Sequence, residues 1–116
     1  MKKNVLQEKS LELASLCLTI SKMLQDKREY SLADQIKRSG TSVGANIAEA
    51  GHPQSRADMI SKFEIALKEA FETDNWLKVL KQARFIDEEI FGVTDKVCTK
   101  IRVLLISSIK TLKSKS

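Results

Sequence analysis

The chain has 116 residues, a formal net charge of +5, 42% hydrophobic residues and 30% charged residues. This length fits one domain with a substantial core, and the hydrophobic content excludes a wholly disordered chain. Few aromatic residues, one proline and four glycines favour long helices over a β-fold. Apolar runs are too short to span a membrane and the N-terminus has no apolar signal region, so we expect a cytoplasmic protein with no membrane partner.

Helical periodicity begins near residue 3 and lapses near residue 27. One stripe of this first helix has the spacing of a core face, with Leu6, Leu13, Cys17, Ile20 and Leu24. Leu11 and Leu18 lie on another side of the helix. They are either ordinary exposed surface or part of a subunit interface.

The second helix is predicted over residues 32–50, with Ser31 as its N-cap and Gly51 in the left-handed conformation after its end. Gly40 and Gly44 lie inside this helix, where each costs about 1 kcal/mol relative to alanine. Two glycines inside one helix therefore indicate a packing requirement that offsets this cost. We therefore predict that another helix packs unusually closely against the two glycines.

Polar residues beside the core stripe of the second helix have two interpretations. Ser39 and Asn46 either form hydrogen bonds between helices, with Asn46 fixing their register, or contact a ligand or partner. Arg38, Ser42 and Glu49 occupy the next arc outward.

A third helix is predicted from a cap at Ser55, with Asp58 in the capping-box position, to about residue 85. Trp76 and Ile65 fall outside its core stripe, so they either pack on a flanking helix or contact a partner.

The fourth helix is predicted from a cap at Asp87 to about residue 112, with a first turn that frays or breaks at Gly92. Four long helices joined by short turns predict an all-α fold. We expect residues 1–116 to form a single domain, an antiparallel up-down-up-down four-helix bundle.

Sequence motifs for catalysis or metal binding are absent. His52 is the one histidine and falls in a predicted turn, while Cys17 and Cys98 lie far apart without CxxC spacing, which is typical of buried free thiols. The Glu-x-x-His pattern of di-iron bundles, the GxSxG elbow and the Walker loop do not occur. We expect no enzyme activity, no cofactor and no metal.

The C-terminal part of the chain is basic. From residue 96 onward there are six basic residues and no acidic one. Five of them fall within about 160° of a helical wheel, opposite the apolar face: Lys96, Lys100, Arg102, Lys110 and Lys113. This stripe predicts nucleic-acid binding through backbone phosphates, or it is a solvated face at the cation-favouring end of a helix. Val103 and Ile106 interrupt the stripe and suggest subunit packing.

Two segments of the chain together resemble a bacterial protein family. They are RSGTSVGANIAEAG in the second helix and IALKEAFETDNWLKVL in the third. The family contains four-helix bundle proteins related to those encoded by intervening sequences in 23S ribosomal RNA genes. In the first segment the matching residues are Arg38, Ser39, Ser42, Asn46, Ile47, Ala48 and Glu49. In the second they are Ala66, Lys68, Glu69, Ala70, Glu72, Thr73, Trp76 and Leu77.

The resemblance implies a four-helix bundle and a homo-oligomer, since relatives commonly form pentameric rings. A related branch, the accessory variability determinant of diversity-generating retroelements, is similar to a basic pentameric barrel that binds nucleic acid and a reverse transcriptase. The resemblance therefore favours RNA as a partner and names no active site.

Two hypotheses follow. The leading one is a non-enzymatic homo-oligomer whose basic face binds structured RNA or an RNA-protein assembly. The alternative is a protein-interaction scaffold that binds no nucleic acid, in which Trp76, Ile65, Val103 and Ile106 contact another protein.

Overall fold

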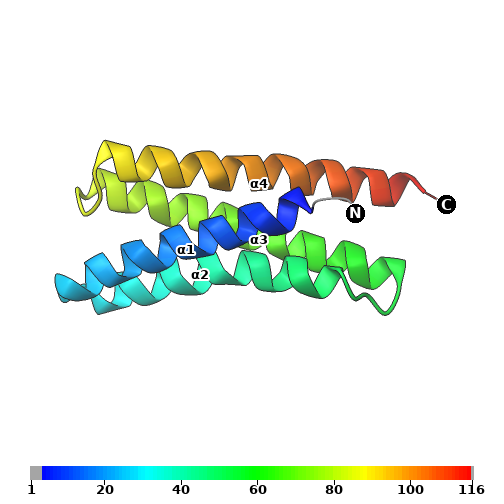
Figure 1. Ribbon diagram of the computed structural model, residues 1–116, viewed down its shortest axis with the longest axis horizontal. Helices are drawn as coiled ribbons and strands as arrows, with labels where there is room; N and C mark the ends of the chain where they lie inside the picture. Colours follow the sequence, from blue (N-terminus) through cyan, green and yellow to red (C-terminus); the bar gives the residue numbers. More distant parts are fainter. Residues whose placement is uncertain (1–3, 116) are drawn as a thin grey trace.

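Residues 4–115 are described by a computed structural model and form four helices: α1 (Val5–Asp26), α2 (Tyr30–Ala50), α3 (Arg56–Gln82) and α4 (Glu88–Ser114). The helices run alternately in opposite directions, and both chain ends lie at the same end of the bundle (Figure 1). The molecule measures 50 × 26 × 22 Å. The prediction of an all-α, antiparallel four-helix bundle is confirmed.

The core is formed by the apolar stripes that the helical spacing predicts. Its largest fully buried apolar side chains are Leu13, Ile20, Leu24, Ile36, Val43, Leu77, Leu80, Ile101 and Leu105. Cys17 and Cys98 are also fully buried as free thiols, as predicted.

Side-chain caps begin three of the helices. The Asn4 side chain accepts a hydrogen bond from Gln7 N in α1, and Ser55 Oγ accepts one from Asp58 N in α3. Asp87 Oδ1 accepts one from Ile90 N at 2.8 Å. The predicted caps at Ser55 and Asp87 are therefore confirmed. Because α4 is fixed at its first turn in this way, it continues unbroken through Gly92, and the predicted break there is wrong.

The prediction that Ser31 caps α2 is wrong, because the helix already begins at Tyr30 after Glu29. The chain reverses quickly at the end of α1, where Glu29 N donates to Leu24 O at 2.8 Å. Arg28 has a φ of 62° in this turn. The left-handed residue and this backbone bond across the turn close α1 and place the next residues directly in α2.

The prediction of a left-handed Gly51 is also wrong. Gly51 has a φ of −73°, and α2 ends with short backbone bonds from Gly51 N to Ala48 O and from His52 N to Glu49 O. The second left-handed position in the described chain is Arg84, with a φ of 65°, which closes α3 as Arg28 closes α1. Arginine fills a position that usually takes glycine at both turns.

The two glycines of α2 permit the close approach that the sequence predicts, and the neighbouring helix is α1. A Cβ at Gly40 would lie 2.5 Å from both Cβ and Sγ of Cys17, and one at Gly44 would lie 3.2 Å from Ser10 Oγ. Ser21 Oγ also donates to Ala33 O at 2.9 Å across this interface.

Each helix packs on its two neighbours in the bundle, and the contact between α1 and α4 is the least extensive of the four. The bundle is therefore most open along the seam between α1 and α4. Over residues 4–115, no helix has the length and apolar character that crossing a membrane requires.

Candidate nucleic-acid interface

The five basic residues predicted to bind nucleic acid all lie on α4, but they occupy two different sides of that helix. Lys96 and Lys100 line a groove between α4 and α1. Lys110 and Lys113 line a groove between α4 and α3, and Arg102 also points toward α3. The basic stripe of the sequence is thus a ridge with a groove on each flank.

The groove toward α1 has a volume of about 820 Å³ and combines cationic and apolar groups. Lys9 and Glu12 border it from α1, and Lys9 Nζ lies 3.5 Å from Glu12 Oε2. From α4 come Lys96 and Lys100 together with two exposed valines, Val93 and Val103. This groove follows the seam between α1 and α4, where the helices contact each other least extensively.

The groove toward α3 has a volume of about 530 Å³ and a mainly apolar floor that includes Leu67, Ile106 and Ile109. Lys113 Nζ lies 2.9 Å from Glu64 Oε2 across this groove. This ion pair links the two helices and neutralises one of the five predicted cations.

Arg102 differs from the lysines because it belongs to a partly buried cluster. Its Nη2 lies 3.1 Å from Thr99 Oγ1 and 3.7 Å from Oδ1 of Asp74, whose side chain is 9% exposed. Lys78 Nζ lies 2.9 Å from the other oxygen of Asp74. Asp95 adjoins Asp74 in the same cluster. The guanidinium of Arg102 is therefore oriented by Thr99 and Asp74 of the same chain.

The cluster shifts the pKa values of its two carboxyl groups in opposite directions. Burial, followed by the ionised Asp74, raises the pKa of Asp95. Burial also opposes ionisation of Asp74, but hydrogen bonding with Asp95 and Lys78 and the charge of Arg102 outweigh it, so the pKa of Asp74 is lowered. Asp95 is the member of the pair that more readily holds a proton.

Arg102 also contacts an aromatic ring. Its guanidinium carbon lies 5.1 Å from the centroid of the Phe71 ring, within the range of a cation–π contact, and Phe71 is 47% exposed. An exposed aromatic ring therefore adjoins the basic ridge on its α3 side.

The remaining three predicted residues present free charge. Lys96, Lys100 and Lys110 are exposed and have no ion pair with any other residue in the described part of the chain. Their ammonium groups are available to an anionic partner. The accessible positive charge of this surface thus comes mainly from the three lysines, with Arg102 oriented beside them.

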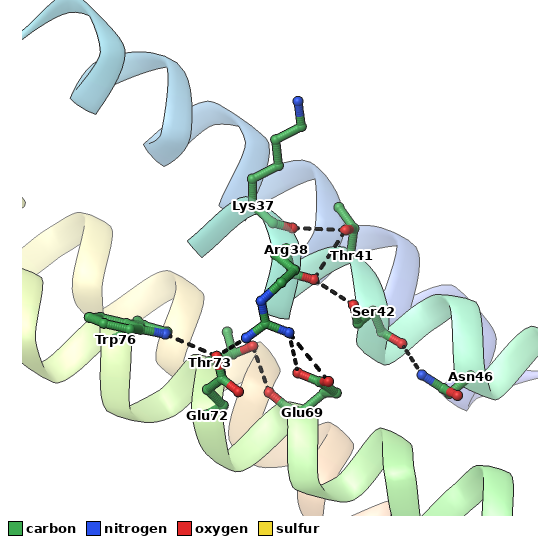
Figure 2. A network of polar contacts seen from close by, with 9 residues as sticks. All are labelled: Lys37, Arg38, Thr41, Ser42, Asn46, Glu69, Glu72, Thr73 and Trp76. Atoms are coloured by element: carbon green, nitrogen blue, oxygen red, sulfur yellow. Dashed lines mark hydrogen bonds and ion pairs between the residues drawn. The ribbon is translucent and has the colours of Figure 1, made fainter. Parts of the chain in front are cut away.

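The polar residues of α2 form a separate network with α3 (Figure 2). Arg38 donates to Glu69 Oε1 at 3.2 Å and to Glu72, whose Oε2 also accepts from Trp76 Nε1 at 3.2 Å. Trp76 is half-buried against the core. Trp76 thus forms a hydrogen bond within its own chain. The charge of Arg38 is paired with the carboxylates of Glu69 and Glu72.

Two other expectations for α2 turn out differently. Asn46 Nδ2 donates to Ser42 O at 2.8 Å, within its own helix, so the prediction that it fixes the register between helices is wrong. Ser39 is fully buried and its hydroxyl has no hydrogen-bond partner in the described residues.

The two thiols and the one histidine lie in different surroundings. Burial raises the pKa of the Cys17 and Cys98 thiols to about 12, so both stay protonated at neutral pH. His52 is exposed in the α2–α3 turn. In residues 4–115 no three His, Cys, Asp or Glu side chains gather to hold a metal ion.

Comparison with known proteins identifies the family. The model of the 23S rRNA-intervening sequence protein family matches residues 2–107. The chain belongs to this family. One similar protein of known structure, from Bacteroides thetaiotaomicron, is described as a protein of unknown function from the S23 ribosomal protein family. The two chains are 47% identical with a TM-score of 0.88, over 91% of this chain and 99% of the other. No curated protein matches the chain.

For this intervening-sequence protein, sequence reasoning missed the Asp74–Arg102–Phe71 arrangement. Asp74 occupies a core position of α3, four residues after Ala70 and three before Leu77, and a charged residue within an apolar stripe was the available signal. The partner of Asp74 depends on how α3 and α4 are rotated against each other, which periodicity does not determine.

Proposed function

We propose that this protein is a non-enzymatic, cytoplasmic homo-oligomer that binds structured RNA, or an RNA-protein assembly, through the basic ridge of α4. One observation carries the proposal. Lys96, Lys100 and Lys110 form no ion pair with another residue of the range 4–115, and from residue 96 onward the chain has no acidic residue. Membership of the 23S rRNA-intervening sequence family supports RNA as the anion.

The physical basis is the release of counterions from RNA phosphates, which gives binding that weakens steeply as salt rises. Three lysines in one subunit give a weak site. Repetition of the ridge around an oligomer raises the apparent affinity, because later contacts form at high effective concentration. Exposed apolar side chains on α1 and α4, such as Leu11 and Val103, support such an assembly, and we propose a ring of five.

Light scattering of the purified protein with and without ribosomal RNA fragments, at low and moderate salt, tests the proposal. We expect an oligomer that gains mass with RNA and releases it as salt rises. The triple variant Lys96→Glu, Lys100→Glu, Lys110→Glu should lose the RNA. Because Lys96 and Lys100 line the same groove as Val103, its oligomer mass is measured without RNA, and the loss is assigned to the ridge only where that mass equals the wild-type value.

A matched control reverses three exposed cations elsewhere: Lys22→Glu, Arg28→Glu and Lys37→Glu. It changes the net charge equally but leaves α4 intact, so it should keep RNA binding. Equal loss in both triple variants would mean that net charge alone attracts RNA. An oligomer that ignores RNA in every condition would instead favour the protein scaffold, for which exposed Val103 and Ile106 are available contacts.

A further inference from the structure

Phe71 is an aromatic ring on the surface of α3, on the side that faces α4. It is 47% exposed, and its neighbours one turn away include Leu67 in the α3–α4 groove and the exposed Lys68. A large apolar ring gains free energy by leaving water, so a half-exposed phenylalanine beside a basic ridge is suited to a partner that covers it.

Arg102 lies against the Phe71 ring. The guanidinium carbon lies 5.1 Å from the ring centroid, and Nη2 is held by Thr99 Oγ1 and Asp74 Oδ1. Because the planar cation is anchored by its own helix and by α3, little of its conformational freedom remains to be lost on binding. Ring and guanidinium together form a fixed stacking surface that still reaches solvent.

The surface continues along the groove of about 530 Å³ between α3 and α4. Its floor includes Leu67 and Ile106, and Ile106 is 49% exposed. Lys68 on α3 and Lys110 on α4 are exposed, and neither forms an ion pair with another residue of the range 4–115. An aromatic platform with an apolar floor and flanking cations matches a chain that carries both flat bases and phosphates.

Double-stranded RNA cannot use such a platform, because the faces of its bases are stacked inside the helix and only base edges, sugars and phosphates reach a convex helical surface. An unpaired stretch can turn a base outward. We propose, building on the RNA-binding function above, that the α3–α4 surface captures unpaired RNA, with a nucleobase stacked on Phe71 beside Arg102 and the adjacent phosphates on Lys68 and Lys110.

Fluorescence anisotropy with a labelled single-stranded RNA and with a duplex of the same length, at fixed salt, tests this proposal. Phe71→Leu keeps an apolar side chain but removes the aromatic face, so it should weaken binding of the single strand on the order of ten-fold and leave the duplex unchanged. Phe71→Trp should preserve single-strand binding. Replacing bases of the wild-type ligand by abasic sites should reproduce the loss seen with Phe71→Leu.

Tyr30→Leu is the matched control, since Tyr30 is a 60% exposed aromatic residue at the start of α2, away from this surface, and it should change neither affinity. Equal single-strand affinity for wild type and Phe71→Leu would overturn the inference while duplex binding upheld the RNA function. A lower oligomer mass for Phe71→Leu would also overturn it, by assigning the ring to a subunit contact. Absence of binding to either RNA would overturn both proposals.

Discussion

At the scale of single residues, the fold depends most visibly on the missing side chain of Gly40. An added Cβ would overlap Cys17 Cβ, which is attached to the α1 backbone and cannot rotate away. Alanine is the better helix former by about 1 kcal/mol, but overpacking in a rigid interface costs about 1–3 kcal/mol. We predict that Gly40→Ala lowers the free energy of unfolding, measured by urea denaturation followed by circular dichroism.

Gly92→Ala is the matched comparison, because nothing lies within 4 Å of the Cβ position at Gly92 in α4. There only the helix propensity changes, so this substitution should raise stability by about 0.5–1 kcal/mol. Stabilisation by both substitutions would show that α1 and α2 are not in close contact at Gly40.

Sequence reasoning succeeded for Gly40 and Gly44, because a residue that weakens a helix needs a packing reason and close approach is a common one. It failed for the residues that end helices. Gly51 had the identity of a left-handed residue, yet Arg28 and Arg84 adopt that conformation. The geometry of a turn is set by where the next helix must pack, and this can override the preference of a single residue.

At the scale of elements, α3 and α4 are joined through the partly buried Asp74–Asp95 pair, which Lys78 and Arg102 accompany. The raised pKa of Asp95 means that the folded state holds a proton more tightly than the unfolded chain. The stability from this carboxyl is therefore present at low pH and is lost as pH rises through its folded pKa. Ionisation of Asp95 beside the charged Asp74 therefore weakens the attraction between α3 and α4.

We predict that Asp95→Asn raises the free energy of unfolding at neutral pH, because it removes a second negative charge beside Asp74. The gain should disappear in acid, once wild-type Asp95 is itself protonated. Urea denaturation of both proteins across the range from neutral pH to about 4, near the ordinary aspartate pKa, measures the difference.

Asp74→Asn should behave in the opposite way. The lowered pKa of Asp74 gives stability that is present above the ordinary aspartate pKa and is lost as pH falls through the folded value. Its replacement also leaves Arg102 without its carboxylate partner, so we expect a loss of about 1–3 kcal/mol at neutral pH. Equal effects of the two asparagine variants would contradict the assignment of the proton to Asp95.

The packing of the helices also shows what sequence periodicity can predict and what it cannot. Periodicity predicts the four helices and most of the core, since these depend on spacing along one helix, while the short turns predict the alternating directions. It groups Lys96 and Arg102 in one stripe, whereas the structure turns Lys96 toward α1 and Arg102 toward α3. The division arises from the position of two neighbouring helices, which a helical wheel does not contain.

At the scale of the whole molecule, two groups of exposed apolar side chains, one on α1 and one on α4, point in different directions. Val93 and Val103 border the α1–α4 groove, as Lys9 does from α1. Leu11 follows Lys9 by two residues, a rotation of about 200° around the helix, so it faces away from that groove. Two different patches suit a head-to-tail contact better than a twofold dimer, and such a contact forms a ring when the rotation between neighbouring subunits closes.

This geometry makes a prediction that separates the proposed ring from other assemblies. Leu18→Glu places a charge in the α1 patch, which contains Leu11 and Leu18, and Val103→Glu places one in the α4 patch, which contains Val93 and Val103. Burying an unpaired carboxylate is costly, so each variant alone should be monomeric by light scattering. Mixed together they retain one intact patch each, and these two patches fit one another. The mixture should therefore form a species of twice the monomer mass and nothing larger. Dimers formed by either variant alone would indicate a twofold contact instead, and an unchanged oligomer in both would place the interface elsewhere on the bundle.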